Sequence, residues 1–126
     1  MANRNPAWIS FLAALWALAL VYSVGAQAQD FPSRPITIIV PVAAGGGTDT
    51  LARTLGLRVQ ESLKQTVVIE NRLGAGGNIG AELVARAKPD GHTLLVTPAT
   101  IATNVAVYKK LPYDLMRDFQ AITLTG

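Results

Sequence analysis

Cysteine is absent from the 126-residue chain, and histidine occurs once, as His92. Without cysteine the protein has no disulfide bonds, so its stability depends on a packed apolar core. The same absence excludes thiol catalysis and cysteine-ligated metals. A single histidine excludes paired-histidine metal motifs, and no Ser–His pair with a local signature is available. We therefore predict no metal, no cofactor and no catalytic group, and we expect His92 to be a surface or half-buried turn residue.

Charged residues are also few, at 15% of the chain, and the basic ones are scattered. Lys109 and Lys110 form the only adjacent basic pair. Proteins that bind nucleic acid gather lysine and arginine on one face or along one helix. The sequence therefore predicts no nucleic-acid partner.

The first 28 residues have the three parts of a secretory signal peptide. Arg4 precedes an apolar run at residues 9–22, and Ala26-Gln27-Ala28 forms an A-x-A cleavage site. A membrane anchor is the alternative, but a run of about 14 residues is shorter than the roughly 20 that span a bilayer. We predict a cleaved signal peptide at residues 1–28, a periplasmic product and one small domain from residue 29.

The mature chain begins with a strand and a helix. Residues 36–42 are β-branched and apolar on both faces, which is typical of a strand buried in a parallel sheet. Three glycines then interrupt the run. Thr48 or Asp49 is the expected N-cap of a helix at residues 50–64. Its buried face should be the stripe formed by Leu51, Leu55, Val59 and Leu63.

This strand–helix unit is repeated further along the chain. A second strand is expected at residues 66–69, then a glycine-rich loop and a helix that Asn78 caps, with Ile79, Leu83, Val84 and Ala87 on its buried face. A third strand at residues 93–96 precedes a weaker helix at 101–108, a loop at 109–119 and a fourth strand at 121–125. The alternation predicts an α/β fold with a mostly parallel βαβαβ sheet.

Three loops should meet at one edge of this sheet, because ligands of parallel α/β sheets bind beyond the carboxyl ends of the strands. They are residues 41–49, 70–78 and 97–100. The first two place glycines before a helix N-terminus, whose free N–H groups and partial positive charge attract an anion. Thr48, Asn78, Thr97 and Thr100 add neutral hydrogen-bonding groups. The edge could therefore hold a carboxylate without a buried cation, unless the glycines only form tight turns.

A nucleotide site fits these loops less well. Neither loop has the lysine that follows the last glycine of a Walker motif. Residues 74–80 have dinucleotide-like glycine spacing, but residues 70–73 separate them from the strand, and Thr97-Pro98 stands where a ribose-binding acid belongs. Asp49 could be imagined as a general base, yet a helix-capping role explains it more simply.

Taken together, the motifs of the chain resemble the Bug family, the substrate-binding receptors of tripartite tricarboxylate transporters. The resemblance covers essentially the whole mature chain. It rests on Pro32-Ser33-Arg34-Pro35, Val40-Pro41, Gly45-Gly46-Gly47-Thr48-Asp49, Glu70-Asn71-Arg72, the run from Gly74 to Gly80, Pro89-Asp90-Gly91, Leu111-Pro112-Tyr113-Asp114 and Asp118-Phe119.

The resemblance implies a type II periplasmic-binding fold, in which two α/β lobes close over a ligand. Residues 29–126 would form part of the first lobe, and the second lobe is missing. The implied ligand is a small organic acid, amino acid or related carboxylate, and the implied partners are membrane permease subunits. The family is not catalytic. The ligand-binding residues that we expect are Val42, Gly46, Gly47, Thr48, Asp49, Gly76, Gly77, Asn78, Thr97 and Thr100.

Two substitutions depart from the family pattern. Val42 stands where many members have an aromatic residue, which should widen the pocket wall, and Leu73 replaces a common proline, which should loosen its loop. Because half of the pocket would be missing, the alternatives are a non-functional remnant of a receptor and an exported α/β enzyme. The residues support the enzyme least.

We predict that the exported protein begins near Gln29, because the A-x-A site ends at Ala28. Mass spectrometry of a periplasmic extract from a bacterium that expresses the chain should find this N-terminus. Recovery of the intact Met1 form from the membrane fraction would show that residues 1–28 are an anchor instead.

Overall fold

The central strand of the protein is β1 (Ile36–Val40), and the other described elements are arranged around it. The computed structural model describes residues 30–125, so the proposed signal peptide lies outside the described residues. β1 pairs in parallel with β2 (Val67–Asn71) on one side and with β3 (Thr93–Leu95) on the other. The register places Ile38 opposite Ile69 and Leu94. The predicted parallel sheet is therefore confirmed, with the strand order β2-β1-β3.

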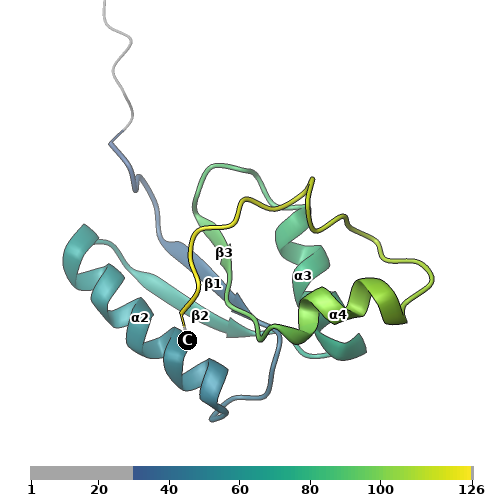
Figure 1. Ribbon diagram of the computed structural model, residues 1–126. Helices are drawn as coiled ribbons and strands as arrows, with labels where there is room; N and C mark the ends of the chain where they lie inside the picture. The colour runs from purple at the N-terminus through teal and green to yellow at the C-terminus, as the bar shows by residue number, and fades with distance from the viewer. Residues whose placement is uncertain (1–29, 126) are drawn as a thin grey trace, which may run out of the picture. The chain divides into compact units, whose positions relative to one another are not determined.

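Helices cover both faces of this sheet (Figure 1). α2 (Gly47–Leu63) lies on one face, while α3 (Asn78–Ala85) and α4 (Thr100–Val107) lie on the other. A single 3-10 turn, η1 (Ala75–Gly77), leads into α3. Alternate residues of β1 point to opposite faces, so Ile36, Ile38 and Val40 pack with Ala52 of α2. A second cluster, on the side of α3 and α4, contains Ala81, Ile101 and Tyr113.

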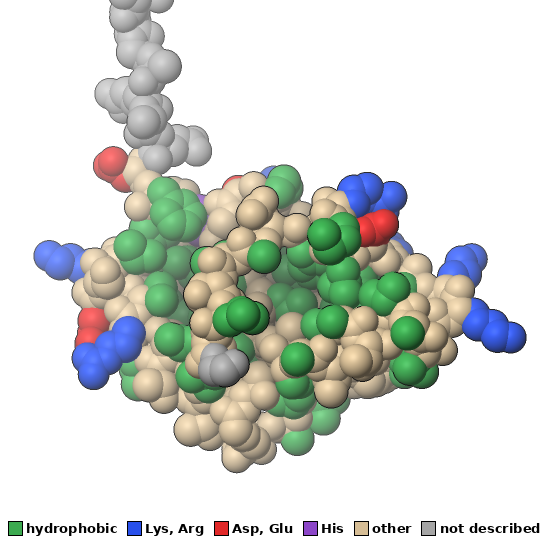
Figure 2. Space-filling view, in the orientation of Figure 1, with side chains coloured by type: hydrophobic (Ala, Val, Ile, Leu, Met, Phe, Trp, Pro, Cys, Tyr) green, Lys and Arg blue, Asp and Glu red, His purple; other side chains and the backbone are tan. Residues whose placement is uncertain are grey.

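Burial on both faces explains why β1 has an apolar residue at nearly every position. Ile36, Ile38, Ile39 and Val40 are each at most 2% exposed. The two neighbouring strands are only partly buried. Apolar side chains gather in the middle of the face shown in Figure 2, and lysine and arginine side chains lie at its margins. No helix within residues 30–125 is long and apolar enough to cross a bilayer.

The buried face of α2 differs from the predicted leucine stripe. Ala52 and Gly56 are its fully buried residues, whereas Leu63 is exposed. The other members of the stripe, Leu51, Leu55 and Val59, are half-buried, and Val59 packs against the core. A Cβ atom at Gly56 would lie 3.0 Å from Ile69 Cδ1, so small residues let the helix lie close to β2. The helix also begins at Gly47 rather than at residue 50, and no side chain caps its N-terminus. The predicted capping role of Thr48 or Asp49 is therefore wrong, because both lie inside the first turn.

The buried face of α3 also differs from the predicted one, of which only Val84 and Ala87 are half-buried. Ile79 and Leu83 are exposed, while Gly80 and Ala81 are buried. Gly80 packs against Pro41 and Ile39. The face of α3 that is buried is therefore the one whose small residues let the helix backbone approach the sheet, not the one with the largest apolar side chains. Asn78 is the first residue of the helix and Gly77 precedes it as the N-cap, so the predicted capping role of Asn78 is also wrong.

Two further expectations need correction. Residues 121–125 do not form a strand, and Ile122 and Leu124 are largely exposed. An apolar alternation becomes a strand only beside a partner, and the described residues offer none there. His92 is 5% exposed, not a surface residue, because the ring of Phe31 packs edge-on against it with centroids 4.9 Å apart. Tyr113 lies in the predicted loop at residues 109–119 and is buried in the second cluster.

A cluster around Asp90 fixes the turn before β3. Arg34 Nη2 donates to both carboxylate oxygens, at 2.8 and 3.1 Å, and the backbone N–H of His92 donates to Oδ1 at 3.1 Å. The Arg34 guanidinium and the His92 N–H lower the pKa of Asp90 to about 2. His92 Nδ1 also lies 3.0 Å from the carbonyl oxygen of Asp90. The turn is thereby tied to the segment that leads into β1.

We predict that Gly80→Ala destabilises the protein by about 1–3 kcal/mol, because the packed surroundings cannot accept a methyl group. The added Cβ would lie 2.9 Å from Pro41 Cβ and 3.0 Å from the carbonyl oxygen of Arg72. Urea unfolding measures the change. Gly47→Ala is the matched control, because a Cβ there meets nothing within 4 Å and should alter stability by less than about 1 kcal/mol, on the favourable side. Equal effects of the two substitutions would contradict this packing.

We also predict that the stability contributed by Asp90 is lost in acid. The pKa of Asp90 is lower in the folded protein than its usual value of 3.8, so the contribution is complete above that value and disappears as the pH falls towards about 2. The stability difference between wild type and Asp90→Asn, measured by urea unfolding, should therefore shrink between about pH 5 and about pH 2. A difference that stays constant over this range would show that the charge of Asp90 contributes nothing.

Candidate functional site

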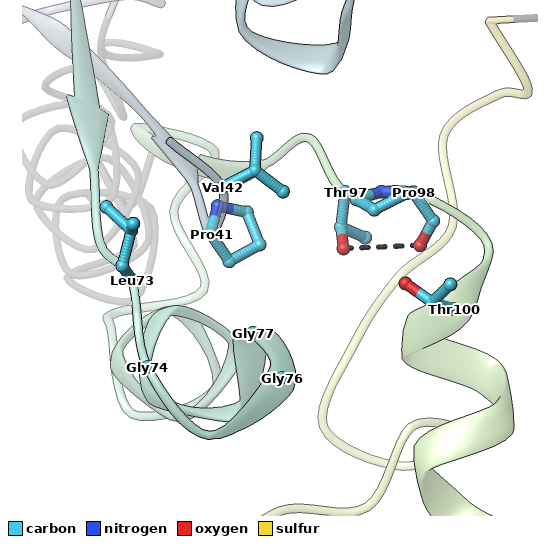
Figure 3. A pocket seen from close by; sticks show the side chains of 9 residues that line it. All are labelled: Pro41, Val42, Leu73, Gly74, Gly76, Gly77, Thr97, Pro98 and Thr100. Atoms are coloured by element: carbon cyan, nitrogen blue, oxygen red, sulfur yellow. Dashed lines mark hydrogen bonds between the residues drawn. The ribbon is translucent and has the colours of Figure 1, made fainter. Parts of the chain in front are cut away.

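A cavity of about 300 Å³ lies beyond the carboxyl ends of the three strands (Figure 3). It opens to solvent and is formed by the segments that follow β1, β2 and β3. The predicted meeting of three loops at this edge is therefore confirmed. The residues that line it are Pro41, Val42, Leu73, Gly74, Gly76, Gly77, Thr97, Pro98 and Thr100.

Five residues expected to bind a ligand line this cavity: Val42, Gly76, Gly77, Thr97 and Thr100. Sequence reasoning missed the other four. Pro41 and Leu73 each lie within two residues of a strand end, and Pro98 follows Thr97 directly, so their place in the chain was a usable signal. The fourth, Gly74, belongs to the predicted second loop at residues 70–78.

The lining carries no charged side chain, and its polar groups are hydroxyls and backbone atoms. Thr97 Oγ1 donates to the carbonyl oxygen of Pro98 at 3.3 Å, and the hydroxyl of Thr100 points towards the space between the loops (Figure 3). Thr100 is also the first residue of α4, and Gly77 directly precedes α3. Two helix N-termini therefore border the cavity, and their partial positive charge favours an anion there.

Glycine is required where the second loop reaches the cavity. Gly77 has a φ of +95°, and a Cβ atom there would lie 3.4 Å from Pro41 Cβ. Gly76 has a φ of +65°, in the left-handed region that other residues rarely adopt. The backbone can therefore form the cavity wall directly, with the Gly77 N–H already donating to the carbonyl oxygen of Gly74 at 2.9 Å.

The N-terminus of α2 lies outside the lining, together with the expected ligand-binding residues Gly46, Gly47, Thr48 and Asp49. Gly46 and Gly47 are exposed, Thr48 is half-buried and Asp49 is 2% exposed. The Asp49 carboxylate accepts hydrogen bonds from Arg53 Nε at 2.9 Å, from the Gly45 N–H at 2.8 Å and from Asn71 Nδ2 at 2.9 Å. These donors hold the pKa of Asp49 well below its usual range. Its negative charge already complements the dipole of α2.

Asn78, another expected ligand-binding residue, lies behind the cavity wall. Its Oδ1 accepts hydrogen bonds from Asn104 Nδ2 at 2.9 Å and from the Tyr113 hydroxyl at 2.6 Å. Burial raises the pKa of Tyr113, so this hydroxyl remains protonated and able to donate. Asn104 Nδ2 also donates to the carbonyl oxygen of Gly76 at 2.9 Å. Asn78 therefore belongs to a buried hydrogen-bond network that holds the loop at residues 70–78 in place.

A family model described as the tripartite tricarboxylate transporter family receptor (TctC) matches residues 51–125. Among similar proteins, BugT of Bordetella pertussis is 41% identical over 79% of this chain and 31% of its own length. The chain spans about a third of the length of the curated relatives it matches.

Two solved structures of Rhodopseudomonas palustris proteins are also similar. Rpa4515, solved with adipate, is 44% identical with a TM-score of 0.63, over 68% of this chain and 29% of that one. MatC (Rpa3494), solved with bound malate, is 52% identical with a TM-score of 0.50, over 52% of this chain and 22% of that one.

The family match covers more than half of the chain and agrees with the motifs that resemble the Bug family. Proteins of this family are periplasmic receptors that bind solutes, not enzymes. The chain belongs to the family of tripartite tricarboxylate transporter receptors.

Proposed function

We propose that the cavity holds one carboxylate group of a small organic acid, and that the chain forms this part of an extracytoplasmic receptor. The observation that supports the proposal is the lining itself. Two helix N-termini, the hydroxyls of Thr97 and Thr100, and the glycine backbone at Gly76 and Gly77 surround a space with no charged side chain. Carboxylates are well stabilised by such N–H and hydroxyl donors.

The ligands of the two solved relatives support the same chemistry. Adipate and malate are both dicarboxylates, and each occurs in a protein more than 40% identical to this chain. A site that uses backbone and hydroxyl donors recognises the carboxylate group rather than the rest of the molecule. The apolar lining at Pro41, Val42, Leu73 and Pro98 then contacts the carbon chain of the acid.

Export and transport complete the proposal. The signal-peptide pattern of residues 1–28 would deliver the protein to the periplasm, and the receptor would pass its ligand to permease subunits in the membrane. The family assignment supports this role, because its members are receptors of tripartite tricarboxylate transporters.

We expect the exported chain to bind dicarboxylates weakly. An open cavity contacts one side of a ligand, so the dissociation constant should be about millimolar, near −4 kcal/mol. Titration with adipate, followed by ¹H–¹⁵N NMR, should shift the amide resonances of Gly76, Gly77 and Thr100. Titration with the corresponding diamide should not, because it lacks the negative charge.

Thr100→Val should weaken this binding by roughly tenfold to a hundredfold, which corresponds to one lost hydrogen bond to a charged group. Valine keeps the shape of threonine, so the fold should be retained. Thr54→Val is the matched control, because Thr54 is an exposed helical threonine whose hydroxyl donates to the carbonyl oxygen of Thr50. Equal affinity of wild type and Thr100→Val would exclude this hydroxyl from the site.

A further inference from the structure

A closed set of hydrogen bonds connects Asp49 and Arg53 of α2 with Asn71 at the end of β2. Arg53 donates from Nε to Asp49 Oδ2 at 2.9 Å and from Nη2 to Asn71 Oδ1 at 3.1 Å. Asn71 Nδ2 donates to Asp49 Oδ1 at 2.9 Å, which completes the ring. Each of the three side chains therefore contacts both of the others. We refer to Asp49, Arg53 and Asn71 as the triad.

The triad also holds the backbone of the loop between β1 and α2. Asn71 Nδ2 donates its second hydrogen to the carbonyl oxygen of Val42 at 3.0 Å, and the Gly45 N–H donates to Asp49 Oδ2 at 2.8 Å. Both ends of the short segment 42–45 are thus attached to one cluster, in which the Asp49 carboxylate is buried and Arg53 is half exposed. Val42 lines the cavity, but no member of the triad does.

The position of the triad suits a role in shaping the cavity rather than in contacting the ligand. Asn71 uses both of its N–H hydrogens, one for the carboxylate of Asp49 and one for the Val42 carbonyl. Only an amide can supply this pair of donors together with an acceptor for Arg53. The negative charge of Asp49 also offsets the partial positive charge at the N-terminus of α2. The N-termini of α3 and α4 have no such carboxylate in their first turn and can attract an anion.

We propose that Asp49, Arg53 and Asn71 are positioning residues, which hold Val42 and the β1–α2 loop in the shape that admits a carboxylate. The inference rests on the proposed function of the cavity and deepens it. The triad couples the end of β2 to the first loop, so the wall at Val42 keeps a fixed position relative to the glycine backbone of the second loop.

Exchanging two side chains separates this positioning role from a purely structural one. In Asn71→Asp, two carboxylates would face each other at hydrogen-bond distance, so stability and affinity should both fall. The double variant Asp49→Asn/Asn71→Asp restores an amide–carboxylate pair, and Arg53 again faces a carboxylate, so stability should return towards wild type. The side chain at position 71 would still present only acceptors to the Val42 carbonyl, so the wall at Val42 should remain displaced.

The experiment measures urea unfolding and adipate affinity for wild type, Asn71→Asp and the double variant, using the full exported chain. We expect the double variant to recover most of the stability while its affinity stays at least about fivefold below wild type, as one missing hydrogen bond implies. Arg53→Gln should also weaken binding. Arg58→Gln, which removes an exposed arginine paired with Glu61, is the matched control and should not.

The outcomes distinguish this inference from the proposed function. If the double variant regains affinity together with stability, the triad acts only through the stability of the fold and the inference is wrong. If wild type binds no dicarboxylate, the proposed function fails. The triad can then still be judged without ligand, because the double variant should shift the amide resonances of Val42 and Ala43, and unchanged resonances would refute its role.

Discussion

The parallel pairing of β1 with strands on both sides is the constraint on which the rest of the structure depends. Parallel strands must be connected by crossovers that pass over the faces of the sheet, so helices bury β1 from both sides. The same pairing brings the carboxyl ends of three strands to one edge. Residues far apart in the sequence, such as Val42, Gly77 and Thr97, therefore line a single cavity.

Close approach of backbone segments determines how this edge is built. Gly80 lets α3 pack against Pro41, and Gly56 lets α2 lie near Ile69 of β2. Larger side chains at these positions would separate the helices from the sheet and move the loops that begin or end beside them. The shape of the cavity thus depends on residues that have little apolar surface of their own, and the exposed leucines of α2 contribute less to it.

Buried and half-buried polar side chains support the cavity from two sides. Asp49 and Asn71 hold the first loop, while Asn78 and Asn104 hold the second. The hydrogen bonds of Asp49, Asn78 and Asn104 satisfy groups that would otherwise be costly to bury. The surface that remains for a ligand consists of glycine backbone, hydroxyls and apolar side chains. An anion can be stabilised there without a paired cation because the helix N-termini supply the positive potential.

The sequence by itself determined the parallel α/β architecture, the three loops that meet and the family. Two-sided apolar strands, glycines before helices and the order of motifs are local features, and they need no tertiary contact to be recognised. Only the tertiary structure decided that Asp49 and Asn78 turn inward, that Gly80 rather than Ile79 faces the sheet, and that residues 121–125 form no strand. Helical periodicity reports which residues share a face. Which face is buried depends on how closely the neighbouring backbone approaches, and that distance is set by residues elsewhere in the chain.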